Sequence, residues 1–332
     1  MNARQATPTV SVVVCAWSEE RWRDLQLAIE SVEHQTVRAS EIVLAVDHNE
    51  ALRERARLRF PDAVIVSNEG RRGLADARNA GLAAASGQIV AFLDDDAIAS
   101  PTWLERLAAC FQDELVLGVG GRVNAAWDAP RPRAFPSEFE WVVGCSYRGL
   151  PEHRSPVRNM IGANMAFRRE VFDAIGGFRS DVGRVGARPL GCEETELCIR
   201  ARAWQPDGTI LYEPAAQVSH RVTTTRATWR YFVSRCIAEG LSKAAVVDSV
   251  GASSGLASER DYTLRTLPSG VARGLADATV RGDAAGVGRA AAIVAGLGLT
   301  AGGYIAGRAS RTRPAQRMRA RRVAAALGGA QP

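Results

Sequence analysis

The sequence predicts an α/β fold: a Rossmann-like, mostly parallel sheet with helices on both faces, followed by a helical extension at the C-terminus. Strand-like and helix-like segments alternate from residue 10 to residue 123, which is typical of βαβ units. The strand-like segments are unbroken apolar runs, as expected for strands buried on both faces. The run 89–93 leads directly into Asp94, Asp95 and Asp96. These carboxylates should therefore lie at the carboxyl edge of the sheet, where open α/β sheets bind ligands.

Each element can be placed in order along the chain. The predicted strands cover residues 10–16, 42–47, 63–66, 89–93 and 116–123. The helix after the first strand has Leu25, Ile29 and Val32 on one face. Beyond residue 126 the pattern is less regular, because prolines and aromatic residues interleave. The elements expected there are a helix ending at Ile175, a helix entered through the acids at 193–196, and two short strand pieces, 210–214 and 218–220.

Composition and charge limit the class of protein. The chain has 332 residues, 46% hydrophobic and 23% charged, which is enough for one large domain with additions. Its net charge of +6 resides in the C-terminal tail, which contains no acid after its first arginine. Those arginines are Arg308, Arg311, Arg313, Arg317, Arg319, Arg321 and Arg322. Because the rest of the chain is nearly neutral, the basic composition does not indicate nucleic-acid binding.

The cysteines and the N-terminus indicate the cellular compartment. The six cysteines are scattered and lack the spacing of a zinc site, which fits reduced thiols in the cytosol. The N-terminus passes from a short polar lead into the first strand, without the charged and apolar regions of a signal segment. We therefore expect the α/β part of the chain to lie in the cytoplasm.

Several phosphate-binding classes are excluded by the turn after the first strand. A dinucleotide-binding dehydrogenase needs G-x-G-x-x-G there, but the sequence reads Ala16-Trp17-Ser18-Glu19-Glu20. No P-loop is present. The glycine-rich, basic loop of a sugar-nucleotide pyrophosphorylase is also missing.

The acidic cluster has two interpretations. Asp94 and Asp96, two residues apart at a strand end, can hold Mg²⁺ or Mn²⁺ that also contacts the phosphates of a substrate. Alternatively, the cluster is an acidic turn that caps the next helix. The other motifs in the chain favour the metal site.

Six motifs in order resemble the family 2 glycosyltransferases, an inverting group with the GT-A fold, over residues 10 to about 222. They are Val46-Asp47, Gly73 through Ala77-Arg78-Asn79, Phe92-Leu93-Asp94-Asp95-Asp96, Gly162-Ala163-Asn164 through Arg168-Arg169, Glu193-Glu194-Thr195-Glu196-Leu197, and His220. The chain departs from the family pattern at Ser18, where Asn is usual, and at His48-Asn49. These departures bear on nucleotide preference more than on reaction type.

The resemblance implies a role for each motif residue. Glu194 matches the general base, usually Asp in the family, and the adjacent Glu193 is a second candidate. The residues expected to bind the nucleotide sugar are Glu19, Asp47, Arg78, Asp94 and Asp95. Those expected to hold the metal are Asp94, Asp96 and His220. Asn164 and Trp141 are expected on the acceptor side. For each acid a solvated turn or helix cap is the competing interpretation, and for His220 a purely structural role.

The implied reaction is the transfer of a sugar, with inversion, from a UDP- or GDP-linked donor to a hydroxyl. Residues 1–125 would form the nucleotide-sugar-binding half of the catalytic domain and residues 126–222 the acceptor-binding half. A lipid-linked or envelope glycan is the favoured acceptor. The alternatives are a polyprenyl-phosphate glycosyltransferase, whose phosphate acceptor needs little base, and a noncatalytic nucleotide-sugar-binding scaffold.

The C-terminal extension, residues 223–332, is expected to be helical and associated with the membrane. The segment 229–247 is amphipathic, and residues 290–307 contain no charge. The uncharged segment can span a bilayer, lie in its interface as a hairpin with residues 267–280, or pack as a soluble helix. The arginines that follow suit anionic lipid headgroups on the cytoplasmic side. We therefore predict attachment at the inner face of the cell membrane.

Overall fold

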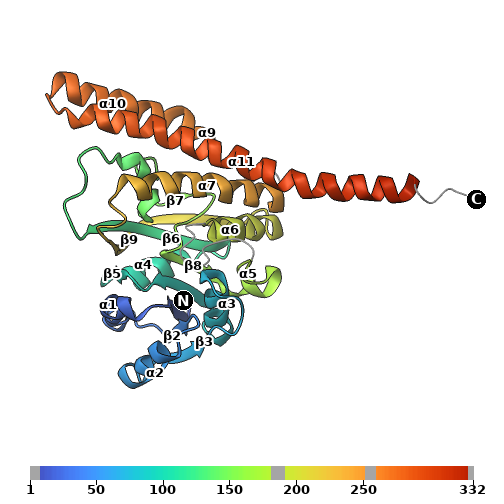
Figure 1. The fold of residues 1–332 in the computed structure, drawn as a ribbon. Coiled ribbons are helices and arrows are strands. Elements are labelled where there is room, and N and C mark those ends of the chain that lie inside the picture. The colour runs from blue at the N-terminus through green and yellow to red at the C-terminus, as the bar shows by residue number, and fades with distance from the viewer. Residues whose placement is uncertain (1–7, 181–190, 251–258, 328–332) are drawn as a thin grey trace, which may run out of the picture.

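The computed structural model describes residues 8–180, 191–250 and 259–327. In these residues nine strands form one sheet in the order β3-β2-β1-β4-β8-β6-β9-β5, with β7 paired to β9 (Figure 1). The strands are β1 (Val10–Ala16), β2 (Glu41–Val46), β3 (Val64–Ser67), β4 (Ile89–Asp94), β5 (Ala97–Ala99), β6 (Val116–Trp127), β7 (Ser155–Pro156), β8 (Asn164–Arg168) and β9 (Thr209–Val222).

The first four long strands are mutually parallel, as the alternation of strands and helices predicts. Their side chains alternate between two buried layers. Val12 and Val14 pack with one layer, which includes Leu25 and Ile29, whereas Val13 packs with the other. The sheet is thus covered on both faces, which explains the continuous apolar runs.

Helices fill both layers and connect the strands. The helices of the sheet region are α1 (Trp22–Glu33), α2 (Glu50–Arg59), α3 (Leu74–Ala84), α4 (Trp103–Cys110), α5 (Arg169–Ile175) and α6 (Glu193–Trp204), with the 3-10 turns η1 (Glu19–Arg21) and η2 (Ser137–Val143). The C-terminal part contains α7 (Trp229–Val250), α9 (Glu259–Asp261), the π-helical turn η3 (Tyr262–Thr266), α10 (Leu267–Val280) and α11 (Ala285–Leu327).

The two short strand pieces predicted at 210–214 and 218–220 are one strand, β9. Its pairing with β6 shifts register between Gly121 and Arg122, whose partners are Glu213 and Gln217. Pro214 has no N–H to donate, so the chain bulges there and the ladder resumes afterwards. The prediction of two separate pieces was wrong because a bulge and a strand end share the same local signal.

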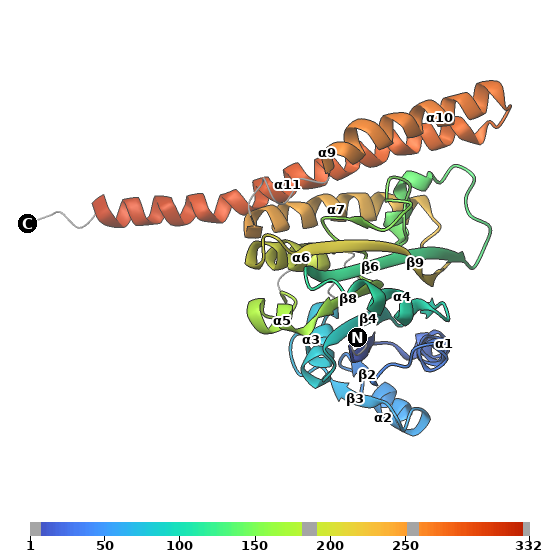
Figure 2. The same ribbon diagram turned by 180° about the vertical axis from the view of Figure 1, so that it is seen from behind.

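The C-terminal helices form an outer layer on the far side of α7 from β2 and β3 (Figures 1 and 2). Helices α10 and α11 make a hairpin, and α11 crosses α7 and continues beyond the body of the molecule. The contact faces carry glycines: Gly240 of α7 lies against Thr300 and Tyr304 of α11. Residues Ala285–Ser310 are long and apolar enough to cross a membrane, and 33% of their most apolar window is buried against the protein.

Substitution of Gly240 should separate α7 from α11. A Cβ atom there would overlap the backbone of Thr300 and Tyr304, so we expect Gly240→Ala to lower the free energy of unfolding by about 1–3 kcal/mol. Gly302→Ala is the matched control on α11, because its Cβ would meet nothing within 4 Å and alanine favours a helix. Thermal unfolding of the two variants measures the difference. Equal melting temperatures would contradict the close approach of these helices.

Candidate active site

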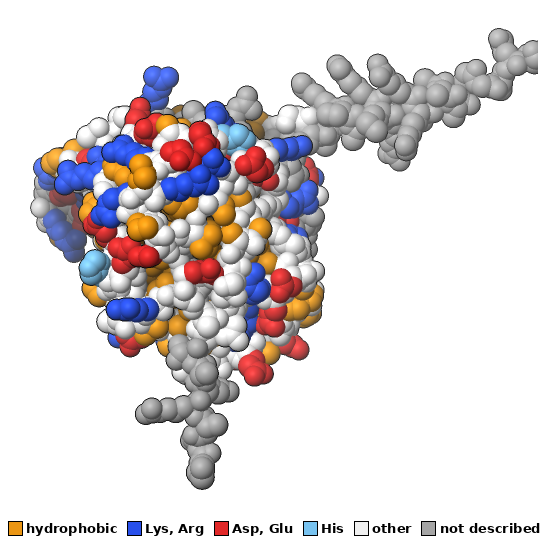
Figure 3. Space-filling view, turned by 90° about the horizontal axis from the view of Figure 1, so that it is seen from below, with side chains coloured by type: hydrophobic (Ala, Val, Ile, Leu, Met, Phe, Trp, Pro, Cys, Tyr) orange, Lys and Arg blue, Asp and Glu red, His pale blue; other side chains and the backbone are white. Residues whose placement is uncertain are grey.

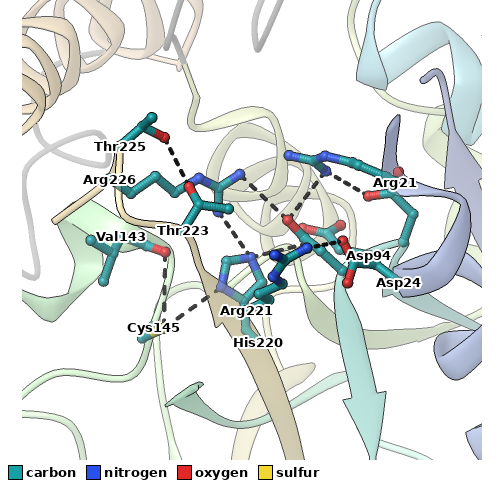
Figure 4. A network of polar contacts seen from close by, with 12 residues as sticks. Arg21, Asp24, Asp94, Val143, Cys145, His220, Arg221, Thr223, Thr225 and Arg226 are labelled. Atoms are coloured by element: carbon teal, nitrogen blue, oxygen red, sulfur yellow. Dashed lines mark hydrogen bonds and ion pairs between the residues drawn. The ribbon is translucent and has the colours of Figure 1, made fainter. Parts of the chain in front are cut away.

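The carboxylates that follow β4 are contacted by cations from three other segments. Arg21, in η1, places Nη1 2.7 Å from Oδ1 of Asp95 and 3.2 Å from Oδ2 of Asp96. His220 places Nε2 3.2 Å from Oδ1 of Asp96, and Nη2 of Arg226 lies 3.4 Å from Oδ2 of the same residue. In Figure 4 the side chains of Arg21, His220 and Arg226 converge on this acidic turn.

Strand pairing explains why His220 reaches the acidic turn. Ala97 of β5 is paired with His220 of the antiparallel β9, and the Arg221 N–H donates to the carbonyl oxygen of Asp96 at 2.9 Å. The end of β4 and the end of β9 are therefore joined by backbone hydrogen bonds. This pairing brings together residues more than a hundred positions apart in the sequence.

Asp94, Asp96 and His220 form a group that can hold a metal ion. One ligand atom from each lies within 4.8 Å of the other two. Two carboxylates and an imidazole suit Mn²⁺ or Mg²⁺, with Mn²⁺ the better match for the nitrogen ligand. Asp94 is the more exposed ligand, with 28% of its side chain accessible, whereas Asp96 and His220 are buried. The donor types and their spacing therefore fit a divalent cation.

The charge state of the group follows from these contacts. Burial would raise the pKa of Asp96, but the nearby His220, Arg21 and Arg226 hold it well below its usual range. Burial by itself would lower the pKa of His220. The effect of the Asp96 carboxylate is stronger than that of burial and raises the pKa of His220 to about 10. Asp96 is thus ready to bind a cation, while His220 must release a proton to do so. Burial also raises the pKa of Asp95 to about 7, against the effect of Arg21.

Arg78 joins the acidic turn to the start of α6. Its side chain is buried, with 2% exposed, and Nη1 donates to Oε1 of Glu193 at 3.0 Å. Nη2 donates to Oδ1 of Asp94 at 3.3 Å and to the carbonyl oxygen of Gly162 at 3.0 Å. A Cβ atom at 162 would lie 2.8 Å from Nη2, so glycine allows the approach. Arg78 is therefore a buried bridge between two acidic groups that also lines the cavity.

The two glutamates at the start of α6 differ in surroundings. Glu193 is buried and paired with Arg78, and its Oε2 has no hydrogen-bond partner among the described residues. Glu194 is partly exposed and faces the cavity. Burial and the neighbouring Glu193 charge raise the pKa of Glu194 to about 8. An accessible carboxylate with a pKa near neutrality is suited to accept a proton.

Both acidic groups open into one cavity of about 390 Å³. One end is lined by Asp94, Asp96 and His220, and Glu193 and Glu194 lie on its wall. Other parts of the wall come from the C-terminal helices and from aromatic residues of η2 and η3. The residues there are Trp141, Tyr231, Arg235, Glu239, Lys243, Tyr262, Leu297, Thr300, Ala301 and Tyr304. The Nε1 of Trp141 donates to the Tyr262 hydroxyl at 3.0 Å, which joins η2 to η3.

Comparison with known proteins places this chain in a family. The model described as "Glycosyl transferase family 2" matches residues 11–176. The glucosyl-dolichyl phosphate glucuronosyltransferase of Haloferax volcanii is 37% identical over 238 residues, which cover 70% of this chain and 76% of the relative. The chain belongs to glycosyl transferase family 2. It is therefore a glycosyltransferase.

One further relative and two solved structures are also similar to this chain. A pre-mycofactocin glycosyltransferase of Mycobacterium tuberculosis is 28% identical over 51% of this chain and 34% of its own. The mannosyltransferase PcManGT of Pyrobaculum calidifontis, solved with GDP-Man and Mn²⁺, has a TM-score of 0.55 at 18% identity, covering 88% of this chain and 87% of its own. GalNAc-T7, solved with UDP, GalNAc and Mn²⁺, has a TM-score of 0.50 at 21% identity, covering 74% of this chain and 48% of its own. These neighbours confirm the predicted GT-A fold.

The structure of this family 2 enzyme does not bring every predicted residue to the cavity. Asn164 is fully buried: its Oδ1 accepts from Trp103 Nε1 at 2.7 Å and its Nδ2 donates to the carbonyl oxygens of Arg122 and Ala216. Its amide is used in joining strands, so the expectation of acceptor contact is corrected. Trp141 does line the cavity.

The two acids expected near the nucleotide also lie outside the lining of the cavity. Glu19 is exposed in η1. Asp47 organises the turn before α3: Oδ1 accepts from Asn68 Nδ2 at 2.7 Å, and Oδ2 accepts from the Gly73 N–H at 3.0 Å. Asp47 therefore shapes the turn at the end of β2.

Two residues that contact the acidic turn were missed by sequence reasoning. Arg21 follows the acids of the first turn, and Arg226 lies in the connection between β9 and α7. Neither belongs to a motif, and an isolated arginine in a polar turn is usually solvated. The one feature of the sequence that could have indicated Arg21 is its position in the turn that follows the first strand. The amphipathic pattern of residues 229–247 allowed α7 to pack on the catalytic domain, but nothing in the sequence indicated that α7, η3 and α11 line the cavity.

Proposed function

We propose that this protein is an inverting glycosyltransferase that moves a sugar from a UDP- or GDP-linked donor to the hydroxyl of a lipid-linked sugar. One observation carries the proposal: a metal-binding group and the carboxylate of Glu194 open into the same cavity. The Haloferax relative supports a lipid-linked acceptor, because its name specifies glucosyl-dolichyl phosphate, and a glucuronosyl donor. A uronic acid is thus the first donor sugar to test.

The residues would share the work as follows. Asp94, Asp96 and His220 would hold Mg²⁺ or Mn²⁺, which supplies a positive charge for the leaving diphosphate when bound. Arg21 and Arg226 keep Asp96 ionised, and Arg78 fixes the position of Asp94 relative to α6. Glu194 would accept the proton of the acceptor hydroxyl as this attacks the sugar carbon. One displacement on the face opposite the leaving group inverts that carbon without an enzyme nucleophile.

The polyprenyl-phosphate alternative remains the second candidate, because the name of the Haloferax relative includes a dolichyl phosphate. In that reaction the acceptor is the phosphate itself, which is already ionised and needs no base. The two candidates differ in their dependence on Glu194.

A thermal-shift screen of UDP- and GDP-sugars with and without Mn²⁺ tests the proposed function. We expect one nucleotide class to raise the melting temperature only when Mn²⁺ is present, because the diphosphate and the acidic group share the ion. UDP-glucuronate, UDP-glucose and GDP-mannose form the core panel, with ATP as the control nucleotide. A uniform lack of stabilisation would contradict the proposal.

We further propose that the outer face of the α10–α11 hairpin attaches the enzyme to the inner face of the cell membrane. Exposed residues on α11 fall on one stripe at helical spacing and are apolar: Val287, Ala291, Val294, Ala301 and Ile305. An ordinary surface helix would carry polar or charged side chains there. On the face of the molecule seen from below, acidic and basic side chains are interspersed with hydrophobic ones (Figure 3). The arginines that follow in the sequence complement anionic headgroups.

Vesicle binding tests this attachment. We expect the protein to co-sediment with vesicles containing anionic lipid, and the triple variant Val287→Ser, Val294→Ser, Ile305→Ser to bind at least about tenfold more weakly, because each side chain loses apolar burial. The control replaces exposed apolar residues elsewhere, Leu58, Val64 and Leu115, with serine. If the wild-type protein stays in solution, the attachment is wrong.

A further inference from the structure

One face of α7 brings three charged side chains into the cavity wall. Arg235, Glu239 and Lys243 follow one another at successive turns, and all three line the cavity. Nη2 of Arg235 lies 3.8 Å from Oε2 of Glu239, and Nζ of Lys243 lies 3.3 Å from Oε1. Their side chains are 11%, 16% and 20% exposed. They form a mostly buried row with two positive charges and one negative charge.

Stability does not explain this row. Ion pairs four residues apart stabilise an exposed helix only slightly, and burying them adds a desolvation cost that the pairing rarely recovers. The apolar contacts between α7 and α11 already hold these helices together, through residues such as Gly240 and Gly303. Charges kept inside a cavity at this cost are a reason to look for a charged ligand.

The position of the row along the cavity indicates which kind of ligand it would bind. Arg226, just before α7, contacts Asp96 at the metal end. Further along α7, Oε1 of Glu239 accepts from Sγ of Cys192 at 3.6 Å, at the start of α6. The Glu239 charge is also among those that raise the pKa of Glu194. Glu194 thus lies close to the middle of the row, and Lys243 lies one turn of α7 farther from the metal end.

The surroundings of the row are amphipathic. Leu297, Ala301 and Tyr304 of α11 also line the cavity, and Tyr304 lies against Gly240, the residue after Glu239. Leu297 is also 39% exposed, so the cavity wall and the outer apolar face of the hairpin meet on one helix. A ligand that extends from Glu194 past the row would place a charged group beside Arg235 and Lys243 and an apolar group against α11.

We propose that Arg235 and Lys243 form a binding subsite for the phosphate of a prenyl-linked acceptor. The inference rests on the proposed function, since it names the group attached to the acceptor sugar. A phosphate oxygen gains charge-assisted hydrogen bonds from both cations, while Glu239 holds the two side chains in place. The nucleotide diphosphate would bind at the metal end of the cavity, so we assign this subsite to the acceptor.

The experiment compares binding of farnesyl phosphate and farnesol to the full chain in detergent. We expect the wild-type protein to prefer farnesyl phosphate by about 10- to 100-fold, as two charge-assisted contacts would provide. The double variant Arg235→Gln, Lys243→Gln should lose that preference. Arg230→Gln is the control, because Arg230 is an exposed arginine on the same helix outside the cavity lining. Lys243→Gln alone should lose part of the preference for farnesyl phosphate. Because Lys243 is at the more exposed end of the row, this single variant serves as the test if the double variant does not fold.

Binding of UDP with Mn²⁺ to the same variants identifies the source of the phosphate. Unchanged UDP binding in the double variant supports an acceptor subsite, whereas an equal loss of UDP and farnesyl phosphate binding assigns the cations to the nucleotide and overturns the proposal. A double variant that keeps its preference for farnesyl phosphate also overturns it. If the phosphate preference behaves as expected but no nucleotide sugar is transferred, the proposed function fails while the subsite stands.

Discussion

Replacing Asp96 with asparagine should lower the rate of sugar transfer by at least about 10³-fold and abolish the stabilisation of the protein by UDP with Mn²⁺. Asp96 is the buried carboxylate of the metal-binding group and is contacted by His220, Arg21 and Arg226. A metal at such a site supplies several kcal/mol of charge stabilisation, and about 4 kcal/mol corresponds to 10³-fold in rate. Initial rates and Mn²⁺-dependent melting temperatures measure both effects.

The Asp96 variant needs a control for the loss of a carboxylate beside arginine. Asp128 follows β6, and its Oδ1 lies 2.9 Å from Nε of Arg221 in β9. Asp128 is not among the residues that line the cavity. Asp128→Asn should keep transfer within a few-fold of the wild-type rate. Asp96→Asn also leaves His220 and Arg226 without their carboxylate partner, whereas Arg21 keeps Asp95. Some loss of stability is therefore expected, and circular dichroism must show that the variant folds. Undiminished transfer by folded Asp96→Asn would refute the metal site.

Replacing Glu194 with glutamine should lower transfer to a sugar hydroxyl by about 10²–10⁴-fold, the usual contribution of a well-placed base. Donor binding should persist, because the metal-binding group is untouched. Glu196→Gln is the matched control: Glu196 lies on the same first turn of α6 but is fully buried and paired with Arg200 at 2.8 Å. We expect Glu196→Gln to lose stability and Glu194→Gln to lose catalysis. A fully active Glu194→Gln enzyme would favour the polyprenyl-phosphate alternative.

The pH dependence of the wild-type enzyme gives an independent test of Glu194. With a pKa of about 8, its carboxyl is mostly protonated at neutral pH and cannot act as a base. Values of kcat/KM should therefore rise with pH and level off above about pH 8. This rising limb should be absent from the residual activity of Glu194→Gln.

The same pKa predicts that Glu194→Gln is more stable than the wild type. Since the ordinary glutamate pKa is 4.5, folding raises it, and the folded state binds a proton that the unfolded state releases between pH 4.5 and pH 8. Wild-type stability therefore falls as pH rises through this range, and glutamine removes the penalty. Allowing for partial exposure, we expect a gain of about 1–2 kcal/mol at pH 8 and none below pH 4. Chemical denaturation at the two pH values measures it.

Much of the fold could be predicted because its signals are local. Apolar runs and the alternation of strands with helices depend only on neighbouring residues, and they predicted the parallel strands β1 to β4. The bulge in β9 could not be predicted, because it depends on the register with β6. Likewise, Asn164 lies in a motif resembling that of the family, but only the packing of β8 against β6 and β9 buries its amide.

The acids themselves were determined by the sequence alone: carboxylates at the end of an apolar strand lie at the carboxyl edge of a sheet wherever that strand is placed. Tertiary structure decided which partners each acid has. The β5–β9 pairing brings His220 to Asp96, and the Arg78 bridge occupies Glu193 while Glu194 faces the cavity. Tertiary structure also placed the C-terminal helices in the wall of the cavity. The physical reason is that hydrogen bonding and burial depend on residues distant in the chain, whereas periodicity and strand ends are properties of adjacent ones.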